Sequence, residues 1–160
     1  LITGTIISAR DAAHKAMTEA LAKGEPLPVD WHDQIVYYLG PTPAKPGDPI
    51  GSAGPTTSGR MDAYTPTMLA QGIKGMVGKG SRSPEVVEAM KKHGVTYFAA
   101  VGGAAALIAK SVKKYEVVGY PELGPEAVAK LTVEDFPCIV VIDSEGNNFY
   151  EMGQKPYRRL

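Results

Sequence analysis

The sequence predicts an α/β fold, formed as a single compact domain over residues 1–160. A chain of 160 residues with 44% hydrophobic content is long enough to bury a core of its own. Short runs of β-branched residues alternate with amphipathic helical patterns, which is typical of α/β proteins. Glycine-rich or polar residues follow three of the predicted strands. Strands are expected at 1–8, 34–39, 73–77, 95–101, 115–119 and 137–143.

The first predicted helix carries three candidate site residues. It begins at the capping-box pattern Ser8-Ala-Arg-Asp11 and ends at Gly24. Small apolar residues form one face, while Arg10, Asp11 and His14 lie on the other. A cation in the first turn opposes the helix dipole unless an anion binds there, so Arg10 is a candidate anion ligand. His14 either supports Arg10 or is an ordinary packed or solvated side chain.

The remaining helices are predicted from caps and breakers. Thr65-Pro66 indicates an N-cap followed by proline, and Ser83-Pro84 indicates another helix that ends at Gly94. Shorter helices are expected at 104–111 and 124–131, and the tail at 153–160 is expected to be loosely ordered. Segment 40–49 is too rich in proline for a helix or central strand, so it either frames a site or makes an edge connection.

Segment 51–62 (GSAGPTTSGRMD) combines glycines, hydroxyls and a cation just before a helical pattern resumes. Glycines let the backbone approach a ligand, Thr56 and Thr57 offer hydroxyl donors, and Arg60 offers a planar fork for a carboxylate or phosphate. These features indicate an anion site, although a glycine-proline loop capped by Ser58 would look the same.

Lys79 lies between two glycines after the predicted strand 73–77. Ligands of open α/β folds collect at the carboxyl ends of strands, so Lys79 either contacts a ligand or is a solvated turn residue. Gly102-Gly103 follows strand 95–101 in the same manner and is a second, weaker candidate for anion binding, which close packing would explain equally well.

Composition excludes several classes of protein. Seventeen basic residues balance seventeen acidic ones, so neither a nucleic-acid groove nor a polybasic membrane surface is indicated. No apolar run is long enough for a membrane span and no signal segment is apparent, so a cytoplasmic protein is expected. The single cysteine, Cys138, is expected inside a buried strand, and no metal site is predicted on this chain. Nucleotide-binding and hydrolase-triad motifs are absent from the sequence.

Taken in order, the motifs resemble a known family: SARDAAHK at 8–15, YYLGP at 37–41, GPTTSGRMD at 54–62, GKG at 78–80, GGAAA at 102–106, then Phe136-Pro137 and Asp143. The set closely resembles the β subunit, or C-terminal domain, of iron–sulfur-dependent class I fumarases and the related tartrate dehydratases. The resemblance implies a compact swivelling β/β/α domain, which makes the sheet mixed rather than purely parallel.

The resemblance also implies roles for individual residues. Arg10, Arg60 and Lys79 correspond to the ligands of the substrate carboxylates, and Thr56 corresponds to a hydroxyl that takes part in proton removal. Asp11, His14 and Thr57 are expected to support them. A [4Fe–4S] cluster would be held by a partner α subunit and not by this chain, giving a heterodimer or an α2β2 assembly that acts on a C4 dicarboxylate.

Three functions are therefore weighed. The leading one is the β subunit of fumarate hydratase, a hydro-lyase that interconverts fumarate and L-malate. The alternatives are the β subunit of L-tartrate dehydratase, or a non-catalytic anion-binding or assembly module that has kept the fold.

Overall fold

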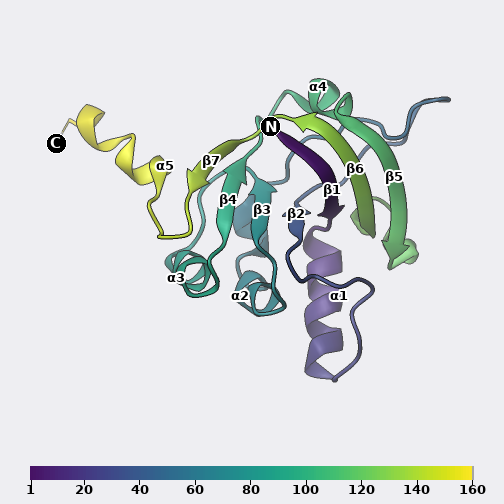
Figure 1. Ribbon diagram of the computed structural model, residues 1–160, viewed down its shortest axis with the longest axis horizontal. Helices are drawn as coiled ribbons and strands as arrows, with labels where there is room; N and C mark the ends of the chain where they lie inside the picture. The colour runs from purple at the N-terminus through teal and green to yellow at the C-terminus, as the bar shows by residue number, and fades with distance from the viewer. Residues whose placement is uncertain (160) are drawn as a thin grey trace.

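In the computed structural model, which describes residues 1–159, seven strands form one mixed sheet in the order β5-β6-β1-β2-β3-β4-β7 (Figure 1). Strands β1 to β4 run parallel to one another, whereas β6 pairs antiparallel with both β1 and β5, and β7 pairs antiparallel with β4. The strands are β1 (Ile2–Ser8), β2 (Ile35–Tyr37), β3 (Gly75–Gly78), β4 (Thr96–Ala99), β5 (Val112–Gly119), β6 (Val128–Phe136) and β7 (Ile139–Ile142). The α/β prediction with a mixed sheet is confirmed.

Helices cover the two faces of the sheet unequally. Helices α1, α2 and α3 lie on one side in Figure 1 and α4 lies on the other, while α5 follows β7 and leads the C-terminal segment away from the sheet. The α-helices are α1 (Asp11–Ala22), α2 (Thr65–Leu69), α3 (Pro84–His93), α4 (Ala105–Ala109) and α5 (Phe149–Met152). Short 3₁₀ segments are η1 (Ser58–Met61), η2 (Pro121–Glu126) and η3 (Lys155–Tyr157).

Each face of the sheet has its own apolar core. On the side of α1 to α3, the buried cluster includes Met17, Trp31, Met68, Met90 and Tyr97. On the side of α4, it includes Tyr37, Leu39, Ile108, Leu131 and Phe136. Because side chains alternate between the faces of a strand, neighbours such as Val36 and Tyr37 of β2 belong to different cores.

The helix predicted at 124–131 is wrong. Residues from Val128 onward form β6, the nine-residue strand that joins β1 to β5, and only the turn η2 precedes it. Leu131 and Val133 are buried while Thr132 and Glu134 are exposed, which is the two-residue period of a strand. Gly124, at φ 57°, and Pro125 interrupt the turn before it can extend.

The start of α1 also differs from the prediction. Ser8 does not cap the helix, since it is still part of β1, where it pairs with Tyr37 and Ala129. The N-cap position belongs to Arg10, which has an extended backbone. Thr65 likewise lies inside α2 and not at its cap. Both errors are shifts of one or two residues at a helix end.

The strand predicted as buried at 137–143 forms the sheet edge β7. Ile139 and Val140 are more than half exposed, because β7 is the last strand of the sheet, whereas Val141 and Ile142 are buried as predicted. Cys138 precedes β7 and is only partly buried, which corrects its predicted place inside a buried strand. In the predicted tail, η3 is exposed, and Leu160 lies outside the described residues.

Candidate functional site

The candidate site lies where the first three parallel strands end. Backbone hydrogen bonds join the segments there: Ala9 N donates to Tyr37 O at 3.1 Å, Thr56 N to Tyr38 O at 2.7 Å, and Ser58 N to Lys79 O at 2.9 Å. Segment 56–58 therefore fits between the chain leaving β2 and the chain leaving β3. The backbones that carry Arg10, Thr56 and Lys79 meet at the carboxyl ends of these strands, as expected for ligand sites in α/β folds.

Asp11 joins the two arginines. Its Oδ1 accepts a hydrogen bond from Arg60 Nε at 2.7 Å, and its Oδ2 accepts one from Arg10 Nε at 3.2 Å. Burial alone would raise the pKa of Asp11, but its own backbone amide and the guanidinium groups of Arg60 and Arg10 outweigh burial and lower that pKa. Asp11 is therefore ionised at neutral pH and holds both arginines at the same place.

The two guanidinium groups differ in how many of their N–H groups remain free to bind a ligand. Arg10 also donates from Nη2 to Glu126 Oε1 at 3.0 Å, and its side chain is 23% exposed. Arg60 is 52% exposed, and among residues 1–159 only its Nε is engaged. Both Nη groups of Arg60 thus remain able to donate to a carboxylate.

Glu126 is a site-edge residue that sequence reasoning missed. Besides Arg10, it accepts a hydrogen bond from the backbone N of Ala12 at 2.7 Å. A free N–H of the first turn of α1 is therefore satisfied by a carboxylate from η2, 114 positions away. No local pattern indicates such a contact, because it exists only once η2 packs against α1.

Lys79 lies beside the turn after β4. A side-chain carbon placed on Gly102 would lie 3.5 Å from Lys79 Cδ and 3.6 Å from its Nζ, so the lysine extends along this turn. Its ammonium has no carboxylate within ion-pair distance in the described part of the chain. Gly102 thus packs against a predicted ligand residue.

Thr56 and Thr57 are held by their backbones and not by their hydroxyls. Thr56 is 9% exposed, whereas Thr57 is exposed and forms an isolated parallel bridge with Lys79. Within residues 1–159, neither hydroxyl is engaged in a side-chain hydrogen bond. Both hydroxyls are therefore free to bond a ligand or a partner group.

His14 is buried, which corrects its predicted place on the polar face of the helix. Its Nδ1 lies 3.0 Å from Arg10 O, and its ring packs edge-on against Tyr38. Burial lowers the pKa of His14 to about 4, so the imidazole is neutral at pH 7. It contacts the backbone of Arg10 and supports the site from beneath.

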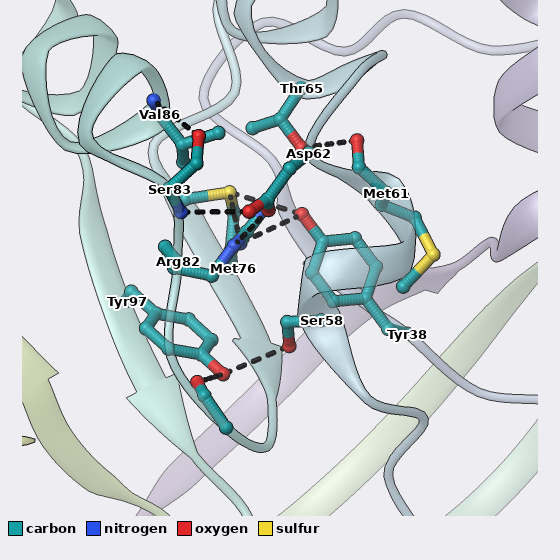
Figure 2. Close-up of polar contacts among 11 residues, drawn as sticks. Tyr38, Ser58, Met61, Asp62, Thr65, Met76, Arg82, Ser83, Val86 and Tyr97 are labelled. Atoms are coloured by element: carbon teal, nitrogen blue, oxygen red, sulfur yellow. Dashed lines mark hydrogen bonds and ion pairs between the residues drawn. The ribbon is translucent and has the colours of Figure 1, made fainter.

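A second layer lies under segment 56–62 and centres on Arg82 (Figure 2). The Arg82 side chain is fully buried and pairs with Asp62 through Nε and Oδ1 at 2.7 Å. Its Nη2 donates to Thr65 Oγ1 at 2.7 Å, and its Nη1 lies 3.3 Å from Tyr38 OH. Sequence reasoning did not single out Arg82, because an arginine between two serines before a helix is most often solvated.

The residues present do not suit a metal cluster on this chain. In the part that the structure describes, no three His, Cys, Asp or Glu side chains are grouped to hold a metal ion. Burial raises the pKa of the lone Cys138 thiol, and a [4Fe–4S] cluster needs several thiolate ligands. Among the same residues, no helix is both long and apolar enough to cross a membrane.

The proline-rich segment lies partly beside the candidate site. Gly40 packs against Arg10, where a side-chain carbon would come within 2.6 Å of Nη1. Farther along, Thr42, Lys45 and Ile50 line a separate open hollow of about 540 Å³ with Lys110 of the other sheet face. None of the predicted site residues lines that hollow.

Fold and site together define the class of protein: an α/β domain that carries Arg10, Arg60 and Lys79 at the carboxyl ends of its parallel strands, with Asp11 orienting the arginines. Such an arrangement suits a small anion that has more than one carboxylate or phosphate group. A family model described as "Fumarase C-terminus" matches residues 1–153. The chain belongs to this family, which confirms the predicted resemblance.

Several relatives align along nearly the whole chain. "Fumarate hydratase class I, aerobic" of Salmonella typhimurium is 46% identical over 96% of the chain, and "Fumarate hydratase 2" of Leishmania major is 45% identical over 94%. In each case the chain spans only 27% of the relative's length. "Putative L(+)-tartrate dehydratase subunit beta" of Methanocaldococcus jannaschii is 43% identical over 99% of the chain and 85% of that subunit.

Proposed function

We propose that this chain supplies the carboxylate-binding side of a fumarate hydratase active site. The observation that carries the proposal is the pair of arginines held together on Asp11, with the free Nη groups of Arg60 beside the segment that bears Thr56. Fumarate and malate each carry two carboxylates. Arg10, Arg60 and Lys79 provide three cations at one edge, enough to neutralise both.

Thr56 is the proposed participant in proton transfer. An alcohol is a very weak acid, so its hydroxyl needs a carboxylate partner to move a proton at neutral pH. Asp11 is already engaged by two arginines, which makes it a poor base. The partner carboxylate is therefore proposed to come from outside this chain, while Asp11, His14 and Thr57 hold the binding groups in place.

The site is proposed to be completed by an α partner, either a separate subunit or the preceding part of a longer chain. The relatives named fumarate hydratase are more than three times as long as the segment they share with this chain. A [4Fe–4S] cluster, which the family resemblance implies, is assigned to that partner because this chain has one cysteine.

A second candidate substrate is L-tartrate. The relative from Methanocaldococcus jannaschii is named as a separate β subunit of tartrate dehydratase, and this chain spans 85% of it. The same three cations would serve either diacid. Fumarate hydration remains the leading proposal, because the relatives with 45% to 46% identity carry the fumarate hydratase name.

Reconstitution with the α partner tests the proposal. The assembled protein, prepared anaerobically, is expected to hydrate fumarate, and a parallel assay with L-tartrate measures the alternative. Binding of a diacid without turnover of either compound would instead favour the non-catalytic module. Absence of any diacid binding would contradict both catalytic readings.

A further inference from the structure

Arg82 is a buried cation that the proposed chemistry does not use. Its side chain is 0% exposed, and its guanidinium lies 5.2 Å from the ring centres of both Tyr38 and Tyr97. Burial disfavours its charge, but Tyr38 and Asp62 more than offset this, so the pKa of Arg82 is raised and the group is charged. A buried charge is tolerated only when it is paired, and the pair fixes its partners in place.

One end of segment 56–62 is bound to the start of α3 through this cation. Asp62 Oδ1 accepts from Arg82 Nε, and its Oδ2 accepts from the backbone N of Ser83, both at 2.7 Å. Thr65 Oγ1 accepts from Arg82 Nη2 and donates to Met61 O at 2.9 Å. The residues directly after Arg60 are thus attached to the residues that follow Lys79 (Figure 2).

The other end of the segment is bound through Tyr97. Its hydroxyl lies 2.9 Å from Ser58 Oγ and 2.9 Å from Gly80 O, and its ring packs against the Arg82 guanidinium. Ser58 precedes Arg60 by two positions, and Gly80 follows Lys79. The same network therefore joins both flanks of Arg60 to the chain beside Lys79.

We propose that Arg82 is a positioning residue that sets the separation of Arg60 and Lys79, and with it the length of dicarboxylate that the site accepts. This inference rests on the proposed function, since it concerns how the same site chooses its substrate. Neither ligand residue is held by a buried contact of its own side chain. The backbone hydrogen bond from Ser58 N to Lys79 O joins the two chain segments, and the polar network beneath them fixes the flanks of both ligand residues.

The site should therefore discriminate between dicarboxylates by the distance between their two carboxylates. A rigid pair of cations binds the diacid whose carboxylates have the matching separation and binds shorter or longer diacids less well. If the network is loosened, the cations can adapt to several lengths, but each diacid is held less well. Misplacement by about 1 Å can cost on the order of a hundredfold in rate.

Arg82→Lys in the assembled enzyme tests this. Lysine keeps the charge but lacks the fork that reaches Asp62, Thr65 and Tyr38 together. We expect kcat/KM for fumarate to fall on the order of tenfold to a hundredfold. Competitive inhibition by malonate, succinate and glutarate should differ clearly in the wild type and converge to within about threefold in the variant.

Two further variants separate positioning from simple destabilisation. Val133→Ala in β6 removes buried volume far along the sheet from Arg82, so it should lower the melting temperature and leave the inhibitor ranking unchanged. Tyr97→Phe removes only the hydroxyl between Ser58 and Gly80, so it should shift the ranking in the same direction as Arg82→Lys but less. It also provides the test if Arg82→Lys fails to fold.

The outcomes distinguish the inference from the proposed function. If the assembled wild type hydrates fumarate and both network variants keep its inhibitor ranking, Arg82 is purely structural and the inference is wrong. If the wild type neither hydrates fumarate nor binds a C4 diacid, the proposed function itself fails. Converged inhibition in Arg82→Lys, with Val133→Ala unchanged, would establish the positioning role.

Discussion

Single residues carry the proposed recognition of the substrate, and Arg60 is the most accessible of the three proposed cationic ligands. Its Nε is held by Asp11 while the rest of its fork faces outward from a side chain that is 52% exposed. Exposed ion pairs contribute only about 0 to 1 kcal/mol to stability, so the Asp11 contact orients Arg60 more than it stabilises the fold. Changes at Arg60 should therefore affect binding without affecting folding.

Arg60→Lys is predicted to lower kcat/KM of the assembled enzyme on the order of tenfold to a hundredfold, because lysine cannot bond a carboxylate through two parallel N–H groups. The melting temperature and subunit assembly should hardly change. Steady-state kinetics with malate and thermal unfolding of one preparation check both statements. Arg158→Lys, near the exposed C-terminal end, is the matched control. Wild-type kinetics in a fully assembled Arg60→Lys enzyme would remove Arg60 from the site.

His14 gives the fold a dependence on pH. Burial lowers its pKa from 6.5 to about 4 in the native state. Between pH 4 and pH 6.5 the unfolded chain therefore binds a proton that the native chain does not bind. Stability should therefore be constant above about pH 6.5 and decrease toward pH 4, by on the order of 3 kcal/mol for this group. Denaturant unfolding at a series of pH values measures the slope.

His14→Gln is the comparison for that slope. Glutamine can still donate to Arg10 O but does not titrate, so the variant should lose less stability than the wild type between pH 6.5 and 4. The carboxylates that begin to titrate near pH 4 are common to both proteins. Equal slopes would mean that His14 is not the group responsible.

At the scale of elements, the close approach of segment 56–62 to β3 depends on a residue without a side chain. At Gly78, an added side-chain carbon would collide with Ser58 Oγ and would lie 2.9 Å from a ring carbon of Tyr38. Gly78 is the last residue of β3 and pairs with Ala99 of β4, so the strand cannot move aside easily. The glycine therefore permits the segment to reach the Arg82 network.

Gly78→Ala is predicted to destabilise the protein by about 1 to 3 kcal/mol, through overpacking between β3 and segment 56–62. Gly59→Ala is the control, since its nearest atoms would be 3.8 Å and 3.9 Å away and its backbone has no positive φ. Denaturant midpoints of the two variants measure the difference. Equal stability of both would show that the segment yields readily and is not held against β3.

At the scale of the whole molecule, the proposed site lacks several groups that the proposed reaction needs. The described residues offer three cations and free hydroxyls, but no cluster of metal ligands, and the best-placed carboxylate is occupied by arginines. The chain covers 27% of the fumarate hydratases named above, so most of such an enzyme lies outside it. Activity should therefore require the α partner.

The chain by itself is predicted to be colourless and inactive, because Cys138 is its only thiol. Absorption spectra and fumarate hydration assays of the anaerobically purified chain, before and after addition of the α partner, check this. A brown iron–sulfur absorption or substantial hydration by the isolated chain would contradict the division of the site between two partners.

Local patterns were enough to predict the α/β class, strands β1 to β4 and helices α1 and α3, and the ordered set of motifs was enough to predict the family. Alternating hydrophobic periods, glycine stops and the proline after Ser83 act over a few residues, so they can be recognised without knowing the fold. The proposed ligands Arg10, Arg60 and Lys79 were found for the same reason, since each lies next to glycines or at a helix start.

Only the tertiary structure revealed β6, the burial of His14 and Arg82, and the contacts of Glu126 with α1. Each depends on partners far away in the sequence: β6 on pairing with β1 and β5, Arg82 on Asp62 and Tyr38, and Glu126 on Arg10. The residues next to such a segment in the sequence do not indicate which distant partners it will contact. Its free energy in the core depends on long-range pairing, which exists only after the sheet and its helices have assembled.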